Sequence, residues 1–165
     1  MKHNMTTHIH FNKFELSIES KDRYTNEKIV RIKIDGLDLI QITREAELPF
    51  AKRDNQEDLA GSYEGIFLAW FPYAEKEFSG TTWPWYPVEA DKGVAAILSC
   101  ECGEIGCWPL YVNIQMDENR VSWSNFKQPY RKDWDLKSIG NYLFRRDEYD
   151  LEILKILETK ERLSL

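Results

Sequence analysis

The stretch 93-GVAAILSCECGEIGCWPLYVNIQM-116 contains the clearest structural signal in this chain of 165 residues. Two apolar runs flank a turn that is rich in glycine, and this pattern predicts a β-hairpin. The segment 120-RVSWSNF-126 follows the polar turn MDEN and alternates apolar with polar residues, which predicts a third antiparallel strand. The centre of the fold is therefore expected to be an antiparallel sheet.

Weaker alternation predicts more strands on both sides of this hairpin. Residues 9–18 read as one strand with a bulge or as two short strands, and 28–34 read as the next strand. A short apolar strand is expected over 66–71, and a last strand over 142–144.

Two helices are predicted from apolar residues at helical spacing. The first is a short helix near 38–48, with Asp38 as its N-cap and Pro49 at its end. The second is a C-terminal helix near 147–161, which Asp147 is expected to cap. Strands followed by helices in this order are typical of an α+β fold in which an antiparallel sheet packs against helices. Residues 1–165 are expected to form a single domain, because a chain of this length can bury a sizeable core.

Composition limits the classes of partner. The formal net charge is −6, which disfavours non-specific binding to nucleic acid or to an anionic membrane. No apolar run is long enough for a signal peptide or a membrane helix, so a cytoplasmic location with reduced thiols is expected. We therefore predict no nucleic-acid partner and no membrane partner, whereas the aromatic content of 13% fits either a compact core or a protein-binding face.

All three cysteines lie within residues 100–107, CECGEIGC. If the turn is 103–106, Cys102 and Cys107 face each other across the ladder, and Cys100 projects to the same face. That register places the three thiols opposite the main apolar stripe of the hairpin.

Three interpretations of the cysteines remain open. They are small, inert structural residues around a tight turn, a metal site, or a site of thiol chemistry. A zinc site would need a fourth ligand, for which His8, His10, an acidic residue or water are the candidates. Thiol chemistry is disfavoured by the absence of a C-x-x-C motif, and the acidic neighbours are expected to raise the pKa values of the thiols.

Two other groups are candidate binding residues. Arg131 with Trp134 and Asp135 suits stacking or carboxylate binding, but an Arg131–Asp135 bridge that pins the 127–141 loop is the simpler interpretation. The segment TTWPWYP forms either a lid over the sheet or an aromatic binding surface, with three aromatic side chains as its candidate residues: Trp83, Trp85 and Tyr86.

Motifs of common enzymes are missing from the sequence. There is no Gly-rich phosphate loop, no G-x-S-x-G and no H-E-x-x-H, and the histidines all lie within residues 3–10. Glu45 with Glu47, or Asp133 with Asp135, could act as an acid/base pair, although a solvated surface is the stronger interpretation. An enzymatic activity is therefore not expected.

The motifs CECGEIGCWP, VSWSNFKQPYR and FRRDEY resemble those of an uncharacterised bacterial protein family, as do DGLDL, REAE and AGSY upstream. That family has C-x-C-G-x-x-G-C-W-P, V-x-W-x-x-F-x-x-P-x-R, F-x-R-x-x-Y, D-G-x-D-L, R-x-x-E and A-G-x-Y elements, and the resemblance extends over about residues 30–150. It departs from the family pattern at Leu136 and at Asn141-Tyr142. The resemblance implies a bacterial origin and no particular reaction.

These observations lead to two functional hypotheses. The favoured one is a cytosolic, non-enzymatic interaction or regulatory module with a protein partner of unknown identity, for which an immunity protein is one form. The alternative is a metal-binding or thiol-dependent protein that uses Cys100, Cys102 and Cys107, with zinc as its cofactor.

Overall fold

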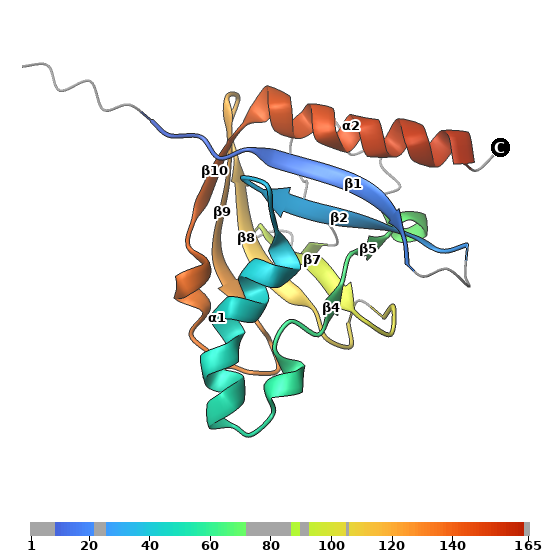
Figure 1. Cartoon of the computed structure of the whole chain (residues 1–165). Helices are drawn as coiled ribbons and strands as arrows, with labels where there is room; N and C mark the ends of the chain where they lie inside the picture. Colours follow the sequence, from blue (N-terminus) through green and yellow to red (C-terminus); the bar gives the residue numbers. More distant parts are fainter. Residues whose placement is uncertain (1–8, 22–25, 72–86, 90–92, 105, 164–165) are drawn as a thin grey trace, which may run out of the picture.

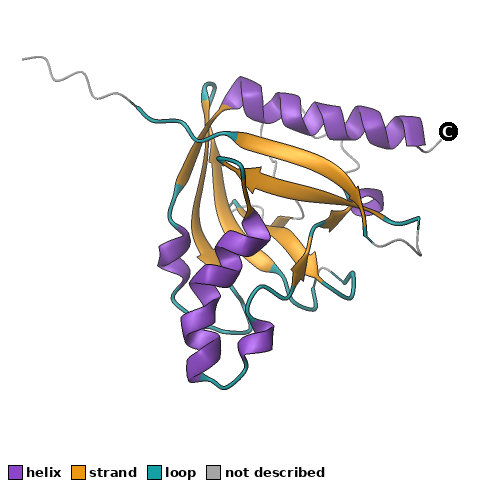
Figure 2. Cartoon of the chain, viewed as in Figure 1, coloured by secondary structure: helices purple, strands orange, loops and turns teal. Residues whose placement is uncertain are grey.

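The structure is a computed structural model that describes residues 9–21, 26–71, 87–89, 93–104 and 106–163. It contains two antiparallel sheets and two α-helices, which confirms the predicted α+β class (Figures 1 and 2). The prediction of one sheet was incomplete, because the strands divide between two sheets that share one hydrophobic core.

The first sheet is built on strand β2 (Lys28–Ile34). Its alternate residues Val30, Ile32 and Ile34 are buried. β1 (Phe14–Ser20) pairs with β2 on one side, and β3 (Leu37–Asp38) and β5 (Ile66–Phe67) pair with it on the other. The first predicted strand therefore begins at residue 14 instead of 9. The predicted strand at 66–71 is reduced to two residues, because the chain turns into a short 3₁₀ helix, η2 (Leu68–Trp70).

The second sheet contains the predicted hairpin and its neighbours. Its strand order is β10-β9-β8-β7-β4, with β6 also paired to β7. The hairpin, the third strand and the last strand that the sequence predicts are all present. The strands are β4 (Tyr63–Glu64), β6 (Pro87–Glu89), β7 (Val94–Cys100), β8 (Leu110–Met116), β9 (Arg120–Lys127) and β10 (Tyr142–Arg145).

The chain passes from the second sheet to the first at Gly65, between β4 and β5. A Cβ atom at this position would lie 2.3 Å from the carbonyl oxygen of Val30 on β2. Only a residue without a side chain lets the backbone come this close. Gly65 thereby allows two strands of two residues each to join different sheets.

Helix α1 (Leu39–Arg53) begins where the sequence predicts it, with the Asp38 side chain accepting a hydrogen bond from the Ile40 N–H. The prediction that Pro49 ends this helix was wrong, because α1 continues through Pro49 for four more residues. Pro49 cannot donate a hydrogen bond to the Glu45 carbonyl. Both residues are exposed, so solvent can satisfy that carbonyl instead.

Helix α2 (Arg146–Leu163) confirms the predicted C-terminal helix and begins directly after β10. Asp147 is consequently a first-turn residue and not the N-cap. α2 lies along β1, the edge strand of the first sheet (Figure 1). There the carboxylate of Glu152 accepts a hydrogen bond from the Leu16 N–H at 3.0 Å, which occupies one donor of the open edge.

Four aromatic rings join the two sheets to α2. Phe14 of β1 stacks on Tyr149 of α2 with 4.3 Å between ring centroids, and it contacts Trp123 of β9 and Phe144 of β10 at 5.4 and 5.2 Å. The Trp123 indole N–H donates to the Tyr149 hydroxyl at 3.3 Å. Edge-to-face and offset contacts of this kind add to the free energy gained by burial.

A buried carboxylate connects α1 to the loop before β4. Glu47 has no exposed surface, contrary to the expectation of a solvated side chain. The Gly61 N–H donates to one of its oxygens at 2.8 Å, and the Tyr63 hydroxyl donates to the other at 2.5 Å. Burial raises the pKa of Glu47 to about 7, although both hydrogen bonds act in the opposite direction.

The same network continues to the segment after β9. Gln128, also buried, donates from its side-chain nitrogen to the Tyr63 hydroxyl at 3.4 Å and to the Pro109 carbonyl at 3.2 Å. Its side-chain oxygen accepts from the Tyr130 N–H at 2.8 Å. The carboxyl of Glu47 thus links α1, β4, the end of the hairpin loop and the 128–131 segment.

The pKa of Glu47 predicts how stability depends on pH. Because the folded-state value of about 7 exceeds the ordinary value of 4.5, the folded protein keeps a proton that the unfolded chain loses between these pH values. The free energy of unfolding should therefore fall as pH rises from 4.5 to 7, by up to about 3 kcal/mol, and then level off. Urea denaturation at pH 5, 6, 7 and 8 measures this.

The matched control is Glu47→Gln, which should show a much flatter profile in the same window. The aspartates whose pKa values are lowered from 3.8 act only at more acidic pH and do not interfere: Asp35, Asp54, Asp117 and Asp135. An equally steep decline in the Glu47→Gln variant would show that another group is responsible.

Candidate metal centre in the cysteine hairpin

The hairpin loop is longer than the sequence suggests. Strand pairing between β7 and β8 ends at Leu98 and Leu110, and Cys100 pairs with Tyr63 of β4 instead. The predicted pairing of Cys102 with Cys107 was therefore wrong, because both residues lie in a loop beyond the ladder. Cys102 and Cys107 are exposed because they lie in this loop, and not because strand alternation directs them away from the core.

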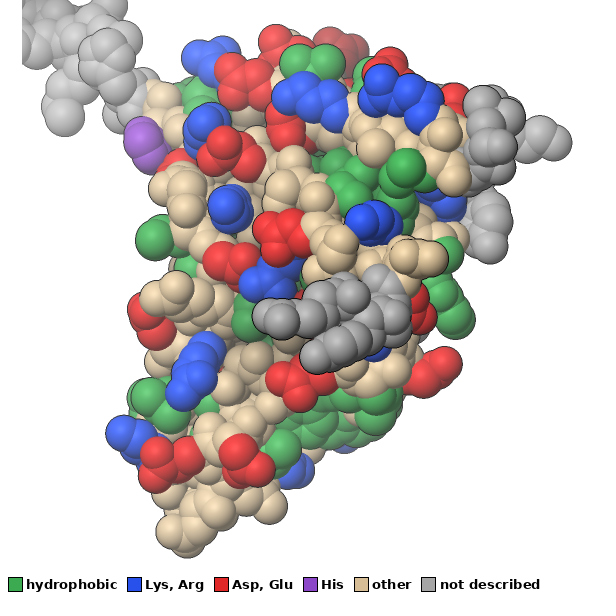
Figure 3. Space-filling model, turned by 45° about the vertical axis from the view of Figure 1, so that its right-hand side comes forward, with side chains coloured by type: hydrophobic (Ala, Val, Ile, Leu, Met, Phe, Trp, Pro, Cys, Tyr) green, Lys and Arg blue, Asp and Glu red, His purple; other side chains and the backbone are tan. Residues whose placement is uncertain are grey.

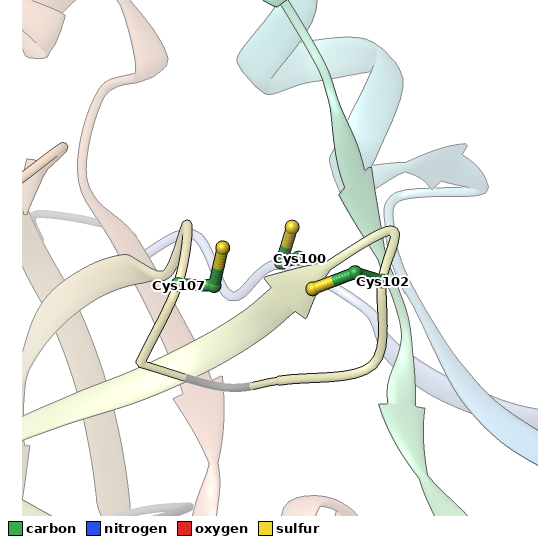
Figure 4. A group of neighbouring side chains, drawn as sticks. All are labelled: Cys100, Cys102 and Cys107. Atoms are coloured by element: carbon green, nitrogen blue, oxygen red, sulfur yellow. The ribbon is translucent and has the colours of Figure 1, made fainter.

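The loop nevertheless brings the three thiols together (Figure 4). The sulfur atoms of Cys100, Cys102 and Cys107 all lie within 4.8 Å of one another. Cys100 is at the end of β7 and is half-buried, whereas Cys102 and Cys107 come from the two arms of the loop and are exposed. Three soft ligands are thus gathered at a solvent-accessible position.

Hydrogen bonds give the thiols different acidities. The Glu104 N–H and the Cys100 thiol donate to the Cys102 sulfur, and these contacts lower the pKa of Cys102 although the nearby Glu104 charge opposes the shift. Burial raises the pKa of Cys100 to about 11, although the Cys102 N–H donates to its sulfur. The expectation that acidic neighbours raise the pKa of every thiol was wrong for Cys102, because backbone and thiol donors outweigh the carboxylate.

The cluster has dimensions that suit a metal ion. Tetrahedral zinc with Zn–S bonds of about 2.3 Å holds its sulfur ligands about 3.8 Å apart. The observed limit of 4.8 Å between the sulfur atoms is about 1 Å above this spacing. The three thiols are therefore close enough to hold a metal ion, with one coordination position left for another donor.

His10, one of the two histidines proposed as fourth ligand, does not join the three thiols. His10 is exposed and precedes Asn12, whose backbone and side chain bond to Leu143 of β10. β10 is separated from β7 by β9 and β8, and Leu143 is level with Gln115 at the end of β8 away from the hairpin loop, so His10 lies more than about 14 Å from the thiols. His8 lies outside the described residues. No described His, Asp or Glu joins the three cysteines.

Two contacts hold the loop in place. Gly103 has a φ of 93° and lies against the ring of Phe67, where a Cβ atom would be 3.1 Å from Cζ. The Tyr130 hydroxyl donates to the Gly106 carbonyl at 2.5 Å. The loop is therefore packed on β5 and tied to the segment that follows Gln128.

That segment contains the predicted Arg131 constellation. The guanidinium carbon of Arg131 lies 5.4 Å from the Trp108 ring centroid and 5.7 Å from that of Trp134. The guanidinium donates to the neutral oxygens of Gln56, at 2.9 Å, and Tyr130, at 3.4 Å, while its buried Nε–H has no partner among the described residues. Cation–π contact, one of the alternatives that the sequence offered for Arg131, is thus present with both tryptophans, whose rings are nearly perpendicular to each other at 81°.

The predicted bridge between Arg131 and Asp135 is not formed. Asp135 pairs with Lys137 at 3.0 Å and caps the 3₁₀ helix η4 (Leu136–Ile139). Trp134 is buried and donates to Asp54 at 2.9 Å. The other predicted aromatic residues, Trp83, Trp85 and Tyr86, lie outside the described residues.

Three residues of this region were not recognised from the sequence as parts of a site. Trp108 stacks on Arg131, Gln128 links Pro109 to Tyr63, and Tyr130 holds the hairpin loop. The position of Trp108 directly after Cys107 was the one available signal, because a large aromatic side chain beside the cluster must pack against a neighbour.

Comparisons of the chain with protein-family models, curated proteins and solved structures find no match. The resemblance to a bacterial family therefore stays a prediction. Within the described residues, no helix has both the length and the apolar character needed to cross a membrane.

The packing of Gly103 predicts unequal effects of alanine at the two glycines of the loop. Gly103→Ala should reduce the free energy of unfolding by about 1–2 kcal/mol, because alanine is strained at positive φ and crowds Phe67. Gly106→Ala is the matched control and should change it by less than about 0.5 kcal/mol, since no atom lies within 4 Å of the added Cβ.

Urea denaturation in the presence of a reductant and a chelator measures both variants without a contribution from bound metal. Equal losses in the two variants would contradict the described role of Gly103.

Proposed function

We propose that the chain is a zinc-binding protein in which Cys100, Cys102 and Cys107 supply three thiolate ligands. The observation that carries this proposal is the mutual approach of the three sulfur atoms within 4.8 Å. Three cysteines in one tight loop are unusual as inert core residues, since two of these side chains are exposed.

Zinc is the metal that this ligand set favours in a reducing cytoplasm. Soft thiolate ligands select zinc, copper(I) or iron–sulfur clusters, and zinc accepts three cysteines with a fourth ligand of another kind. The N–H donors of Cys102 and Glu104 are directed at two of the sulfurs, where they stabilise negative charge. The loop therefore favours the thiolate at Cys102, whereas Cys100, with its raised pKa, would release a proton when a metal binds.

The fourth position connects zinc binding with the hypothesis of an interaction module. Water or a donor atom from another molecule can occupy it, because Cys102 and Cys107 are exposed. A protein partner that supplies this ligand is compatible with the proposal. On the face shown in Figure 3, acidic and basic side chains are interspersed, which supports a protein rather than nucleic acid as partner.

A second candidate function is thiol chemistry at Cys102. Its exposed sulfur and lowered pKa favour the thiolate, and Cys100 and Cys107 are close enough to act as resolving thiols. Zinc bound to the Cys102 sulfur would slow its reaction with a thiol-labelling reagent, so one experiment can separate the two functions.

The zinc proposal predicts one zinc ion per chain in protein purified without an affinity tag and in the presence of a reductant. Cys107→Ser should weaken zinc binding at least a hundredfold, because loss of a direct ligand exceeds the 10- to 100-fold effect of second-layer residues. Elemental analysis and competition with a chromophoric chelator measure stoichiometry and affinity.

The control is His10→Ala, which should keep its zinc, and the same measurement on His8→Ala shows whether His8 supplies the fourth ligand. A Co²⁺ titration provides a second readout, since thiolate-to-metal absorption reports how many sulfur ligands bind. Metal-free protein with a Cys102 that reacts rapidly with a thiol-labelling reagent would refute the zinc proposal and favour thiol chemistry.

A further inference from the structure

A second site lies on the other side of the Arg131 segment. A pocket of about 930 Å³ opens between the ends of β8 and β9 and the 127–141 loop. This volume is within the range of small-molecule sites. None of the three cysteines lines the pocket, so it is separate from the candidate metal centre.

The buried part of the pocket is apolar. Phe126, Trp134 and Leu136 contribute to its lining and are each at most 5% exposed. Trp134 is fixed by its hydrogen bond to Asp54 and by stacking on Phe50 at 6.4 Å between ring centroids. The floor of the pocket is therefore apolar and is held in place before a ligand binds.

The charges around the pocket are unequally paired. Its two acidic residues already have cationic partners, since Asp133 pairs with Arg53 and Asp135 pairs with Lys137. Lys127 and Lys132 form no ion pair with any described residue.

Arg131 adds a third cation without a carboxylate in direct contact. Its hydrogen-bond acceptors are the neutral oxygens of Gln56 and Tyr130, and its guanidinium lies over the rings of Trp108 and Trp134. Asp54 is near enough for Arg131 to help lower its pKa, but its oxygens are occupied by Trp134 and Arg53. The pocket therefore concentrates positive charge in a chain whose net charge is −6.

We propose that this pocket binds a small organic anion, with an aromatic or apolar body against Trp134 and Phe126 and a carboxylate or phosphate group facing Arg131, Lys127 and Lys132. The arginine suits either group, because its donors match the oxygen pairs of both. The proposal is independent of zinc, since it rests on different residues.

The test compares four probes of similar shape: benzoate, phenyl phosphate, benzyl alcohol and benzylamine. Each is titrated into the whole chain and followed by tryptophan fluorescence and by calorimetry. Benzoate and phenyl phosphate should bind at least tenfold more tightly than benzyl alcohol, and benzylamine should bind more weakly still. The tighter of the two anions identifies the preferred group, and inorganic phosphate alone shows how much of the affinity comes from the body of the ligand.

Variants assign the binding to this pocket. Arg131→Gln should weaken anion binding at least tenfold. Because Arg131 also holds its own segment, the exposed pair Lys127→Gln/Lys132→Gln provides a second variant that leaves the packing intact and should weaken binding at least threefold. Arg145→Gln is the matched control, since Arg145 also lies over an aromatic ring, Phe11, but is not part of the pocket lining.

The result that would overturn the proposal is equal binding of benzoate and benzyl alcohol, no binding of any anion at millimolar concentration, or equal losses in the Arg145→Gln and Lys127→Gln/Lys132→Gln variants.

Discussion

The burial of Glu47 is the constraint on which the part of the protein with both candidate sites depends. Glu47 is the one acidic or basic residue among the described residues that is buried. Removing a carboxyl group from water is costly unless hydrogen-bond donors replace the water. The chain supplies these donors from Gly61 and Tyr63, so the backbone before β4 and the side chain that begins β4 must meet α1 at one point. Gln128 then extends this point to Pro109, at the end of the hairpin loop.

The two candidate sites are joined by a few side chains that this network holds in position. Trp108 follows the last cysteine of the hairpin and packs on Arg131, and the Tyr130 hydroxyl bonds to the Gly106 carbonyl inside the loop. Each contact joins the thiol loop to the segment that lines the anion pocket. The two candidate sites are therefore connected in the structure, although the thiol ligands and the cations of the pocket are different residues. The buried indole N–H of Trp108, which has no partner among the described residues, lies between the two candidate sites.

Much of the architecture followed from the sequence. Alternation predicted β2 and β9, because a strand with one buried face must have a period of two, and two apolar runs around a glycine-rich turn predicted the hairpin strands β7 and β8. Asp38 marked the start of α1, since a side-chain acceptor is needed there for free N–H groups. The cysteines were recognisable as candidates because few other side chains bind soft metals. Arg131 and Trp134 were recognisable because an arginine near an aromatic ring suits cation–π contact. These features depend on local geometry, which neighbouring residues determine.

Tertiary structure decided how those residues combine. No local pattern shows that Gly65 carries the chain between two sheets, because the Val30 carbonyl that requires a glycine there is 35 positions away. The ladder between β7 and β8 stops at Leu98 and Leu110, which leaves Cys102 and Cys107 in a loop where their sulfur atoms approach that of Cys100. Likewise, Asp135 pairs with Lys137 and not with Arg131. The Arg131 guanidinium instead contacts the rings of Trp108 and Trp134. The sequence by itself determined which chemical groups are present and which strands and helices carry them. Their partners were decided only by the packing of distant segments, since a side chain is paired by whatever the fold brings within a few ångströms of it.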